Sequence, residues 1–321
     1  MWRYVVRRLL WVVLVVLIIT AFTYVVFFVM PPTDPAVQFA GKNPTPDQIA
    51  EVRRQFGLDR PVWAQYGLFL RHLIGGDQYG WPGLGFSFVT RSPVRDQLLD
   101  RLPVTIQLAF GAALVWLCIG IPIGIVSAIK RRSLLDRATM LGALFFVSAP
   151  VFWLGLVALW LFWFQLHWSP GTGYVDLGTS FGGWLSHMIL PWVVLALLFA
   201  AFYARMTRGN LIETMGQDYI RTARVKGLPE WKVILKHGVR ASLTPVVTLI
   251  GLDLGSLLGG AVITETVFNL QGVGQWAVNS VFEGDLPAVL AVTIIVALAV
   301  TLMNLIVDIV YAYLDPRVRY T

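Results

Sequence analysis

Long apolar blocks alternate with shorter polar segments along this chain. Six blocks hold enough hydrophobic residues to cross a bilayer as a helix, which takes about 20 residues. Pro150 inside the third block predicts a kink, and Pro191 interrupts the fourth, which Arg205 closes. The pattern predicts an all-α integral membrane protein with six transmembrane helices, at residues 9–30, 103–129, 139–164, 188–205, 243–264 and 288–312.

The composition supports the same fold class. Only 13% of the 321 residues are charged and 57% are hydrophobic, whereas soluble proteins carry roughly 25% charged residues. The first apolar block is too long for the hydrophobic region of a signal peptide, and no small-residue cleavage site follows it, so we expect a retained span. Cys118 is the single cysteine, which excludes disulfides and thiolate metal sites within the chain.

The basic residues predict the orientation of these spans. Seventeen of the 25 Lys and Arg residues fall in segments on one side of the predicted membrane, if the N-terminus is inside. The other eight lie in the long segment 31–102, which exceeds the roughly 60-residue limit of the positive-inside rule. The short outer loops 167–187 and 267–287 contain neither residue. We therefore expect both termini inside, and this distribution argues against a nucleic-acid partner despite the net charge of +7.

Four parts follow from this arrangement. Residues 1–30 are the first transmembrane helix, and 31–102 an extracytoplasmic segment with short helices. Residues 103–313 are a five-helix core that contains a cytoplasmic loop at 206–240, and 314–321 are a cytoplasmic tail.

The extracytoplasmic segment carries clear helix signals. Residues 45–48 (Thr-Pro-Asp-Gln) predict a capping-box start, and Gly57 can end that helix. A second short helix before Gly75-Gly76 would place four residues on one face: Trp63, Tyr66, Gly67 and Leu70. The two helices cap the outer mouth, either as a packed cover alone or in contact with a ligand.

The stretch 218–240, DYIRTARVKGLPEWKVILKHGVR, is a basic segment between two apolar blocks. Gly227-Leu228-Pro229 predicts a helix stop, a turn and a helix start. On the second helix, one face would hold Trp231, Ile234, Leu235 and Gly238, and another Lys232, Lys236 and Arg240. Such an amphipathic pair either lies on anionic lipid or docks into a groove of a cytoplasmic partner.

The same stretch resembles the cytoplasmic "EAA" loop of the permease subunits of ABC-type importers. Ala223 and Gly227 keep the Ala-x-x-x-Gly spacing of that loop, although Arg221 stands at the position of the family's glutamate and the usual proline is displaced to Pro245. These departures are typical of the dipeptide/oligopeptide (and nickel) permease family. RRLL (7–10), PVRDQLLDRLPVTIQL (93–108), LGGAVITETVF (258–268) and LDPRVRY (314–320) resemble the same family. The segment QYGWPG (78–83) and Gln271-Gly272 depart from it.

The resemblance implies a type I ABC importer permease architecture in the plasma (inner cytoplasmic) membrane. It implies that this chain forms half of a peptide pathway with a second permease subunit, and that an extracytoplasmic binding protein delivers di- or oligopeptides. Two cytoplasmic ATPase subunits, identical or different, would bind ATP and Mg²⁺, so this chain would need no cofactor. The residues expected to couple to them are Arg221, Thr222, Ala223, Arg224, Lys226, Gly227, Leu228, Pro229, Glu230, Trp231 and Lys232.

We do not expect this chain to catalyse a reaction itself. It has no Gly-x-x-x-x-Gly-Lys-Ser/Thr loop, no His/Glu pair at metal spacing and no marked nucleophile, so we predict no enzyme activity, no catalytic residue and no metal site. Buried acids leave a secondary transporter as the rival hypothesis. Asp253 is its candidate ion site, with a structural hydrogen bond or a place in the pathway as alternatives. A nickel chelate or another small solute is the alternative substrate.

Span five is the candidate for the face toward the partner permease and the pore. Glycines at every fourth position let helices approach closely. The loop 267–287 is either an outer gate or an ordinary connector. The pathway and interface candidates are Gly251, Asp253, Gly255, Gly259 and Glu265.

Overall fold

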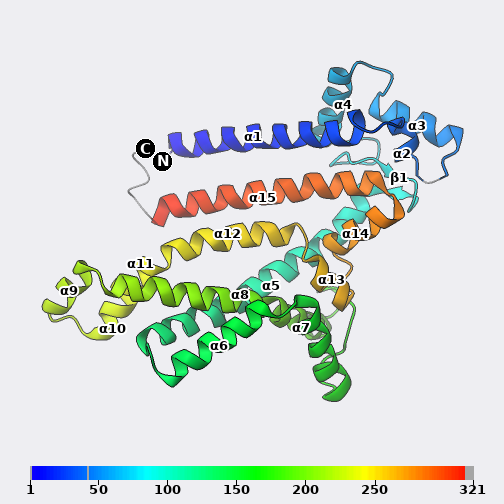
Figure 1. The fold of residues 1–321 in the computed structure, drawn as a ribbon. Helices are drawn as coiled ribbons and strands as arrows, with labels where there is room; N and C mark the ends of the chain where they lie inside the picture. The colour runs from blue at the N-terminus through cyan, green and yellow to red at the C-terminus, as the bar shows by residue number, and fades with distance from the viewer. Residues whose placement is uncertain (1, 42, 315–321) are drawn as a thin grey trace. The chain divides into compact units, whose positions relative to one another are not determined.

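The computed structural model describes residues 2–41 and 43–314, which are mostly helical (Figure 1). The predicted tail beyond Leu314 lies outside the described residues. In the described part, four helices are long and apolar enough to cross a membrane. They are α1 with its continuation η1 (Trp2–Tyr24 and Val25–Val29), α5 (Val94–Ile129), α8 (Phe181–Met215) and α15 (Leu286–Leu314).

Two bent helix pairs raise the possible number of spans to six. One joins α6 (Leu134–Ser148) to α7 (Val151–Ala158) and η2 (Leu159–Gln165) through a bend of 103°. The other joins 230–242 to α12 (Thr244–Leu258) through a bend of 42°. Segment 230–242 comprises α10 (Glu230–Lys232), η3 (Val233–Val239) and α11 (Arg240–Ser242). The chain is mostly helical, as predicted, with four to six candidate membrane spans by length and composition.

Three predicted helix boundaries differ from the observed ones, each at a proline or a glycine. Pro150 breaks the third block into two helices rather than kinking it, because it opens α7 as its N-cap. Pro191 has the opposite outcome: α8 runs through it without a break and covers far more than the predicted 188–205. Membrane helices tolerate an internal proline where neighbouring groups satisfy the freed carbonyl. Predicted span five ends early, at Leu258, because Gly260 adopts a φ of +109°.

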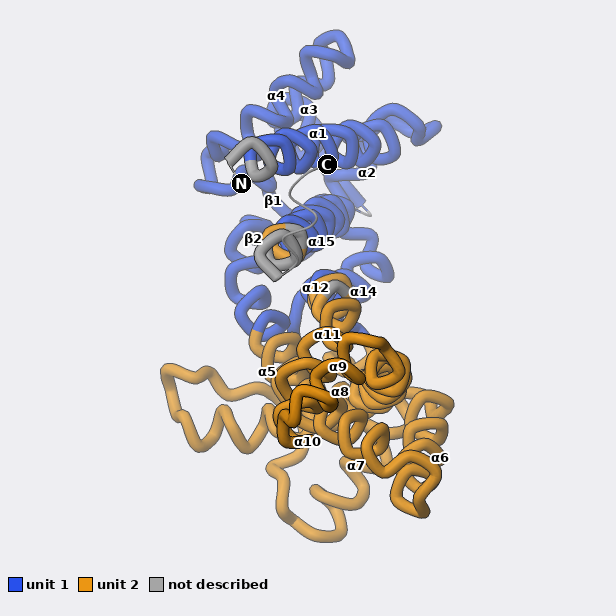
Figure 2. Tube along the Cα trace, turned by 90° about the vertical axis from the view of Figure 1, so that its left-hand side faces the viewer, with its two compact units in different colours: residues 1–106, 255–262, 271–305 blue, residues 107–254, 263–270, 306–321 orange. Residues whose placement is uncertain are grey.

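The chain divides into two compact units, shown in two colours in Figure 2. Unit 1 comprises residues 1–106, 255–262 and 271–305, and unit 2 comprises 107–254, 263–270 and 306–321. Besides α1 and most of α15, unit 1 holds α2 (Pro35–Phe39), α3 (Pro46–Phe56), α4 (Val62–Gly75), the strands β1 (Phe86–Ser87) and β2 (Ser92–Pro93), and α14 (Val273–Glu283). Unit 2 also holds α9 (Asp218–Val225) and most of α13 (Val262–Phe268). The strands are antiparallel, with Phe86 opposite Pro93.

The two short helices predicted in 31–102 are confirmed as α3 and α4 in unit 1, and we call them the outer helix pair after their predicted side of the membrane. Thr45 and Gln48 form a capping box, in which each side chain accepts a hydrogen bond from the backbone N–H of the other. Gly57 ends α3 in a left-handed conformation with a φ of +61°. An N-terminal box and a glycine stop together explain why these residues form a helix of this length.

An aromatic cluster holds this outer pair against the end of α1. Its members are Tyr24, Phe28, Phe39, Phe56 and Phe69, four of them buried, and Leu290 and Ile294 of α15 close it. The rings of Phe28 and Phe39 stack with centroids 4.6 Å apart. Burying one such side chain contributes about 1.5–3 kcal/mol, so the cluster stabilises this part of unit 1 strongly.

The predicted face of α4 is correct for two of its four residues. Tyr66 and Leu70 pack on the aromatic cluster, but Trp63 is 78% exposed and Gly67 is exposed as well. Phe69 is the residue that α4 buries most deeply. The proposed face had a spacing consistent with a helix but was rotated relative to the surface that the cluster covers.

The loop 267–287 contains the packed helix α14, and its role as an outer gate or an ordinary connector stays a prediction. Val273 at the start of α14 donates its backbone N–H to Thr105 Oγ1 at 2.8 Å, and Arg101 lies over the ring of Trp276 at 5.2 Å from its centroid. After α14, Asp285 is buried and accepts a hydrogen bond from Ser87 Oγ at 2.6 Å. These contacts anchor the loop within unit 1.

Unit 2 is built on a close crossing of α5 and α8. A Cβ on Gly120 would lie 2.8 Å from the carbonyl oxygen of Ala200, and one on Gly124 would lie 2.5 Å from that of Ala204. Small residues four apart allow this approach. One helical turn before Gly120, the buried Trp116 stacks on Phe199, with ring centroids 4.6 Å apart.

Candidate functional site

The turn between α9 and α10 has the geometry of a Schellman motif. Gly227 has a φ of +75°, and its N–H donates to the carbonyl of Arg224 at 2.9 Å. The N–H of Leu228 reaches back to the carbonyl of Ala223 at 3.4 Å. Pro229 then caps the start of α10. The prediction of a helix stop, turn and helix start at these residues is confirmed, since glycine alone adopts this φ without strain.

An ion pair crosses the same turn. Arg224 donates Nη2 to Glu230 Oε1 at 2.7 Å and Nε to Oε2 at 3.2 Å, so the contact is bidentate. This hydrogen bonding raises the pKa of Arg224 above its usual value. The pair joins the end of α9 to the start of α10 and helps to set the angle between the two helices.

One face of the helix pair is packed against its own chain. Ile220 and Ala223 of α9 and Val233 of η3 form a small buried cluster, with Met215 at the end of α8 packed against it. Further along η3, a Cβ on Gly238 would lie 2.9 Å from the sulfur of Met215 and 3.1 Å from Leu211 Cδ1. The end of α8 is therefore the platform on which the pair rests.

The predicted apolar face of the second helix is wrong in part. Gly238 is buried, but Trp231 is 61% and Leu235 54% exposed, and the buried partner of Gly238 is Val233. For Leu235 the cause is the π-helix from Val233 to Val239, whereas Trp231 lies before it in α10. In a π-helix the repeat is i to i+5, so Val233 and Gly238 share a face that a period of 3.6 residues does not give.

The eleven residues expected to couple to an ATPase lie together on this pair. All of them except Ala223 are exposed, and Ala223 belongs to the buried cluster. The exposed face also carries apolar side chains that the list omitted: Tyr219 is 47% exposed, Val225 88% and Leu235 54%. With Trp231, these are exposed apolar residues of the pair, and we use the name docking face for the set Tyr219, Val225, Trp231 and Leu235.

The glycines of span five pack within the chain. In unit 2, a Cβ on Gly251 would lie 1.6 Å from Val307 of α15. In unit 1, a Cβ on Gly255 would lie 3.3 Å from Met303, and one on Gly259 2.8 Å from Val296. Close helix approach at these glycines is therefore real, and α15 is the helix that approaches. Their assignment to a pathway or a permease interface stays a prediction.

The two acids of span five have structural surroundings. Asp253 accepts a hydrogen bond from Tyr203 of α8 at 2.6 Å, and Tyr203 is completely buried. This agrees with the structural alternative for Asp253. Glu265 lies on α13 and is completely buried as well. A role for either acid in the pathway stays a prediction.

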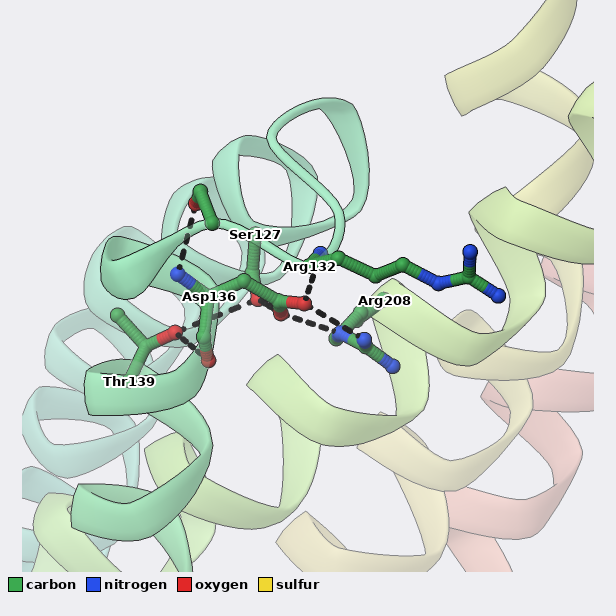
Figure 3. Close-up of polar contacts among 6 residues, drawn as sticks. Ser127, Arg132, Asp136, Thr139 and Arg208 are labelled. Atoms are coloured by element: carbon green, nitrogen blue, oxygen red, sulfur yellow. Dashed lines mark hydrogen bonds and ion pairs between the residues drawn. The ribbon is translucent and has the colours of Figure 1, made fainter.

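A buried carboxylate that the sequence reasoning missed lies near the helix pair. Asp136, in the first turn of α6, is 3% exposed. Figure 3 shows it facing Arg208 of α8, which donates Nε to Oδ1 at 2.6 Å and Nη2 to Oδ2 at 2.8 Å. Ser127 Oγ of α5 also donates to Oδ1, and the backbone N–H of Arg132 donates to Oδ2 at 2.9 Å. Arg132 has a φ of +67°, which turns its N–H toward the carboxylate.

This Asp136 cluster, consisting of Ser127, Arg132, Asp136 and Arg208, joins three helices through one side chain. A buried charge is stable only when it is paired and hydrogen-bonded, and here four donors meet one carboxylate. Little in the sequence indicated this cluster. Ser133 and Asp136 are typical of a helix start, but nothing in the spacing indicates that Asp136 has a partner 72 residues away. No group of three His, Cys, Asp or Glu side chains suited to a metal ion occurs among the described residues.

Known proteins resemble this chain over its whole length. The family model described as binding-protein-dependent transport system inner membrane component matches residues 120–320, and the model for the N-terminal part of such membrane components matches residues 1–109. The dipeptide transport system permease protein of Alkalihalophilus pseudofirmus is 36% identical, with 100% of both chains covered. A probable D,D-dipeptide transport system permease protein of Escherichia coli is 38% identical, with 99% of this chain and 97% of the relative covered.

Among solved structures, a chain of the MetNI methionine ABC transporter in an inward-facing conformation is similar to this one. The TM-score is 0.55 at 19% identity, and the match covers 70% of this chain and 98% of the other. At this identity the likeness supports the fold alone.

Proposed function

The chain belongs to the family of inner membrane components of binding-protein-dependent transport systems, and on that premise we propose that it imports peptides as one permease subunit of an ATP-driven complex. Family membership makes it a multi-pass protein of the inner membrane. Peptides are the proposed cargo because relatives at 36–38% identity over essentially the whole chain are named dipeptide and D,D-dipeptide permeases.

The proposed orientation places both termini in the cytoplasm, with each bent helix pair counted as one of six spans. The absence of Lys and Arg from 167–187 and 267–287 supports it. In this orientation the α9–α10 turn, the docking face and the Asp136 cluster are cytoplasmic. The outer helix pair and α14 are extracytoplasmic.

The observation that carries the proposal is the docking face. Isolated exposed apolar residues are ordinary, but several on one helix pair whose opposite side is already packed indicate a protein or membrane contact. The Schellman turn and the Arg224–Glu230 pair fix the shape of this face in the chain alone. A preformed helix pair suits insertion into a groove of an ATPase subunit.

The mechanism follows from differential binding. ATP-driven closure of two ATPase subunits would move the helix pair, and α8 would carry that movement into the spans, because the pair rests on Leu211 and Met215. ATP can shift the population of permease conformations only by binding one arrangement more tightly than the other. This chain supplies shape and rigidity, and the ATPase subunits bind ATP and Mg²⁺.

The other partners are a second permease subunit, which completes the pathway, and a peptide-binding protein outside. Exposed aromatic residues mark the proposed extracytoplasmic contacts within unit 1: Trp63 on α4, Trp81 in the 78–83 segment, and Phe282 on α14, which are 78%, 65% and 79% exposed. Aromatic anchors of this kind dominate many protein interfaces.

Substitution at the turn tests the proposal. A Cβ on Gly227 meets no atom within 4 Å, and aspartate tolerates a left-handed conformation better than most residues. We expect Gly227→Asp to leave the protein in the membrane at its normal level, yet to abolish both ATPase co-purification and uptake of a labelled dipeptide. The added carboxylate would face the incoming ATPase, and its effect on the chain itself would be limited to backbone strain at the turn.

Gly182→Asp is the matched control. It makes the same chemical change at a position that also has no atom within 4 Å, at the opposite end of α8. ATPase recovery should stay normal in this variant. Normal ATPase recovery with Gly227→Asp would refute docking through this turn. Purification of the wild-type chain without any Walker-motif ATPase or second permease would refute the importer proposal itself.

A further inference from the structure

The Asp136 cluster lies where movement of the helix pair would enter the spans. Arg208 is seven residues before the end of α8 at Met215, which is about 10 Å along a helix that rises 1.5 Å per residue. Leu211 and Met215, on the intervening stretch, contact the second helix at Gly238. Arg208 is therefore on the same rigid segment that supports the docking face.

On its other side, Arg208 is tied to two further helices. Its guanidinium fork is bidentate to Asp136 of α6, and the same carboxylate accepts from Ser127 at the end of α5 and from the turn between α5 and α6 (Figure 3). Thr139 Oγ1 donates to the backbone carbonyl of Asp136 at 3.0 Å, one turn further along α6. Movement of Arg208 consequently acts on α5, on α6 and on their connection.

The direct approach from the helix pair to this connection is open. A cavity of about 450 Å³ lies between the end of α5, the end of α8 and the pair, with Ile129, Arg131, Met215, Glu230 and Ile234 among the residues that line it. Close packing does not fill this space, so the pair does not push on the α5–α6 turn across it. Movement of the pair therefore reaches the spans through α8.

A bidentate ion pair differs physically from the apolar contacts around it. Two parallel hydrogen bonds fix both distance and direction, whereas apolar side chains can slide past one another at nearly constant contact area. The fork therefore resists displacement in either direction along or across α8. The burial of Asp136 strengthens this, because its side chain is 4% exposed and water has little access to the carboxylate.

We propose that Asp136 and Arg208 are positioning residues for transport: their ion pair makes α5, α6 and α8 move as one body when the ATPase subunits displace the helix pair. The inference rests on the proposed function. Neither residue touches substrate or ATP. Loss of the pair should leave the helix pair docked and ATP hydrolysed, while the spans fail to follow.

The test uses the whole complex in proteoliposomes: both permease subunits, the ATPase subunits and the peptide-loaded binding protein. Peptide uptake and ATP hydrolysis are measured in the same vesicles, and their ratio is the readout. We expect Asp136→Asn, which keeps the size and removes the charge, to lower peptide transported per ATP by at least about tenfold. Hydrolysis and the amount of assembled complex should stay near the wild-type values.

A conservative series separates positioning from simple bracing. Arg208→Lys keeps the charge and one hydrogen bond but loses the fork, so its transport per ATP should lie between those of the wild type and Arg208→Gln. Glu51→Gln is the matched control, because it breaks an exposed ion pair, that with Arg54, by the same loss of charge. It should leave the ratio unchanged.

An unchanged ratio of uptake to hydrolysis in Asp136→Asn would overturn the inference. Where uptake, hydrolysis and assembled complex all fall together at that unchanged ratio, the pair is a brace and nothing more. If Asp136→Asn does not accumulate in the membrane, the same ratio of uptake to hydrolysis is measured in Arg208→Lys and Arg208→Gln, and it tests the inference in the same way. A wild-type complex that assembles without its ATPase would instead refute the proposed function.

Discussion

Two helix pairs outside the long helices share one plan and differ in what they bury. In unit 1, α3 ends at a left-handed Gly57 and α4 starts after Pro61. In unit 2, α9 ends before a left-handed Gly227 and α10 starts after Pro229. Glycine stops and proline starts a helix in both, as the sequence predicts.

The two pairs differ in where their apolar side chains pack. The outer pair places Phe56 and Phe69 in an aromatic cluster with residues of α1 and α2. The α9–α10 pair buries Ile220, Ala223 and Val233 and leaves the four residues of the docking face in solvent. The first pair completes its packing inside the chain, and the second leaves exposed the surface that we propose for the ATPase. The same local design can therefore serve stability or docking.

The largest expected effect comes from removing one aromatic residue on each side of this comparison. Phe39 is 1% exposed and packs on the outer pair, so Phe39→Ala should lower the free energy of unfolding by about 3–5 kcal/mol. Trp231→Ala should change it by less than about 0.5 kcal/mol but weaken ATPase binding by about 2 kcal/mol, as at an interface hot spot.

Thermal unfolding of the detergent-purified chain gives the stability of both variants, and titration with the ATPase subunit gives the affinity. Equal destabilisation by the two substitutions would show that Trp231 packs within the chain. Unchanged ATPase affinity of Trp231→Ala would contradict the docking face.

An intermediate effect is expected from alanine at the two turn glycines. At Gly227 the added Cβ has no neighbour within 4 Å, so the cost is backbone strain alone, about 1–2 kcal/mol. At Gly57 the Cβ would also lie 2.9 Å from Leu68 Cδ2, so Gly57→Ala should cost more. Thermal unfolding again ranks the variants. Gly67→Ala, in the interior of α4 with open space around it, is the control and should stabilise slightly.

The test is which of Gly57→Ala and Gly227→Ala loses more stability. A larger loss at Gly227 than at Gly57 would mean that the α9–α10 turn packs more tightly than its open surroundings indicate.

The smallest effect is expected from the exposed ion pairs of the two regions. Glu230→Gln breaks the pair with Arg224, and Asp34→Asn breaks the pair with Arg53 but keeps the N-cap of α2, because asparagine caps as well as aspartate. Exposed pairs contribute about 0–1 kcal/mol. Each variant should therefore unfold close to the wild type, and high salt should reduce even that difference. A loss above about 2 kcal/mol in Glu230→Gln would assign the turn geometry to the ion pair instead of Gly227.

Local signals predicted local structure well. The capping box at Thr45 and Gln48 and the stop at Gly227 are confirmed because each depends on residues within one turn of the chain. The apolar blocks predicted the membrane helices because a span needs only sufficient length and hydropathy. Pro150 and Pro191 show the limit of such signals: the same residue type ends one helix and lies inside another, according to what surrounds it.

The π-helix at Val233–Val239 shows a second limit. A period of 3.6 residues was assumed for the face of that helix, whereas the π-helix buries Val233 and Gly238 and leaves Leu235 exposed. No residue in the segment marks a π-helix by type. Contact of Gly238 with the end of α8 accompanies it, and that contact exists only in the folded chain.

By itself, the sequence determined that this chain is a helical membrane protein, which apolar blocks contain its long helices, and where the α9–α10 turn occurs. Hydropathy, charge and capping are properties of neighbouring residues, so they can be read along the chain. The tertiary structure alone decided which residues meet: Asp136 with Arg208, Asp253 with Tyr203, and the glycines of α12 with α15. Such partners are far apart along the chain, and their pairing depends on how whole helices pack.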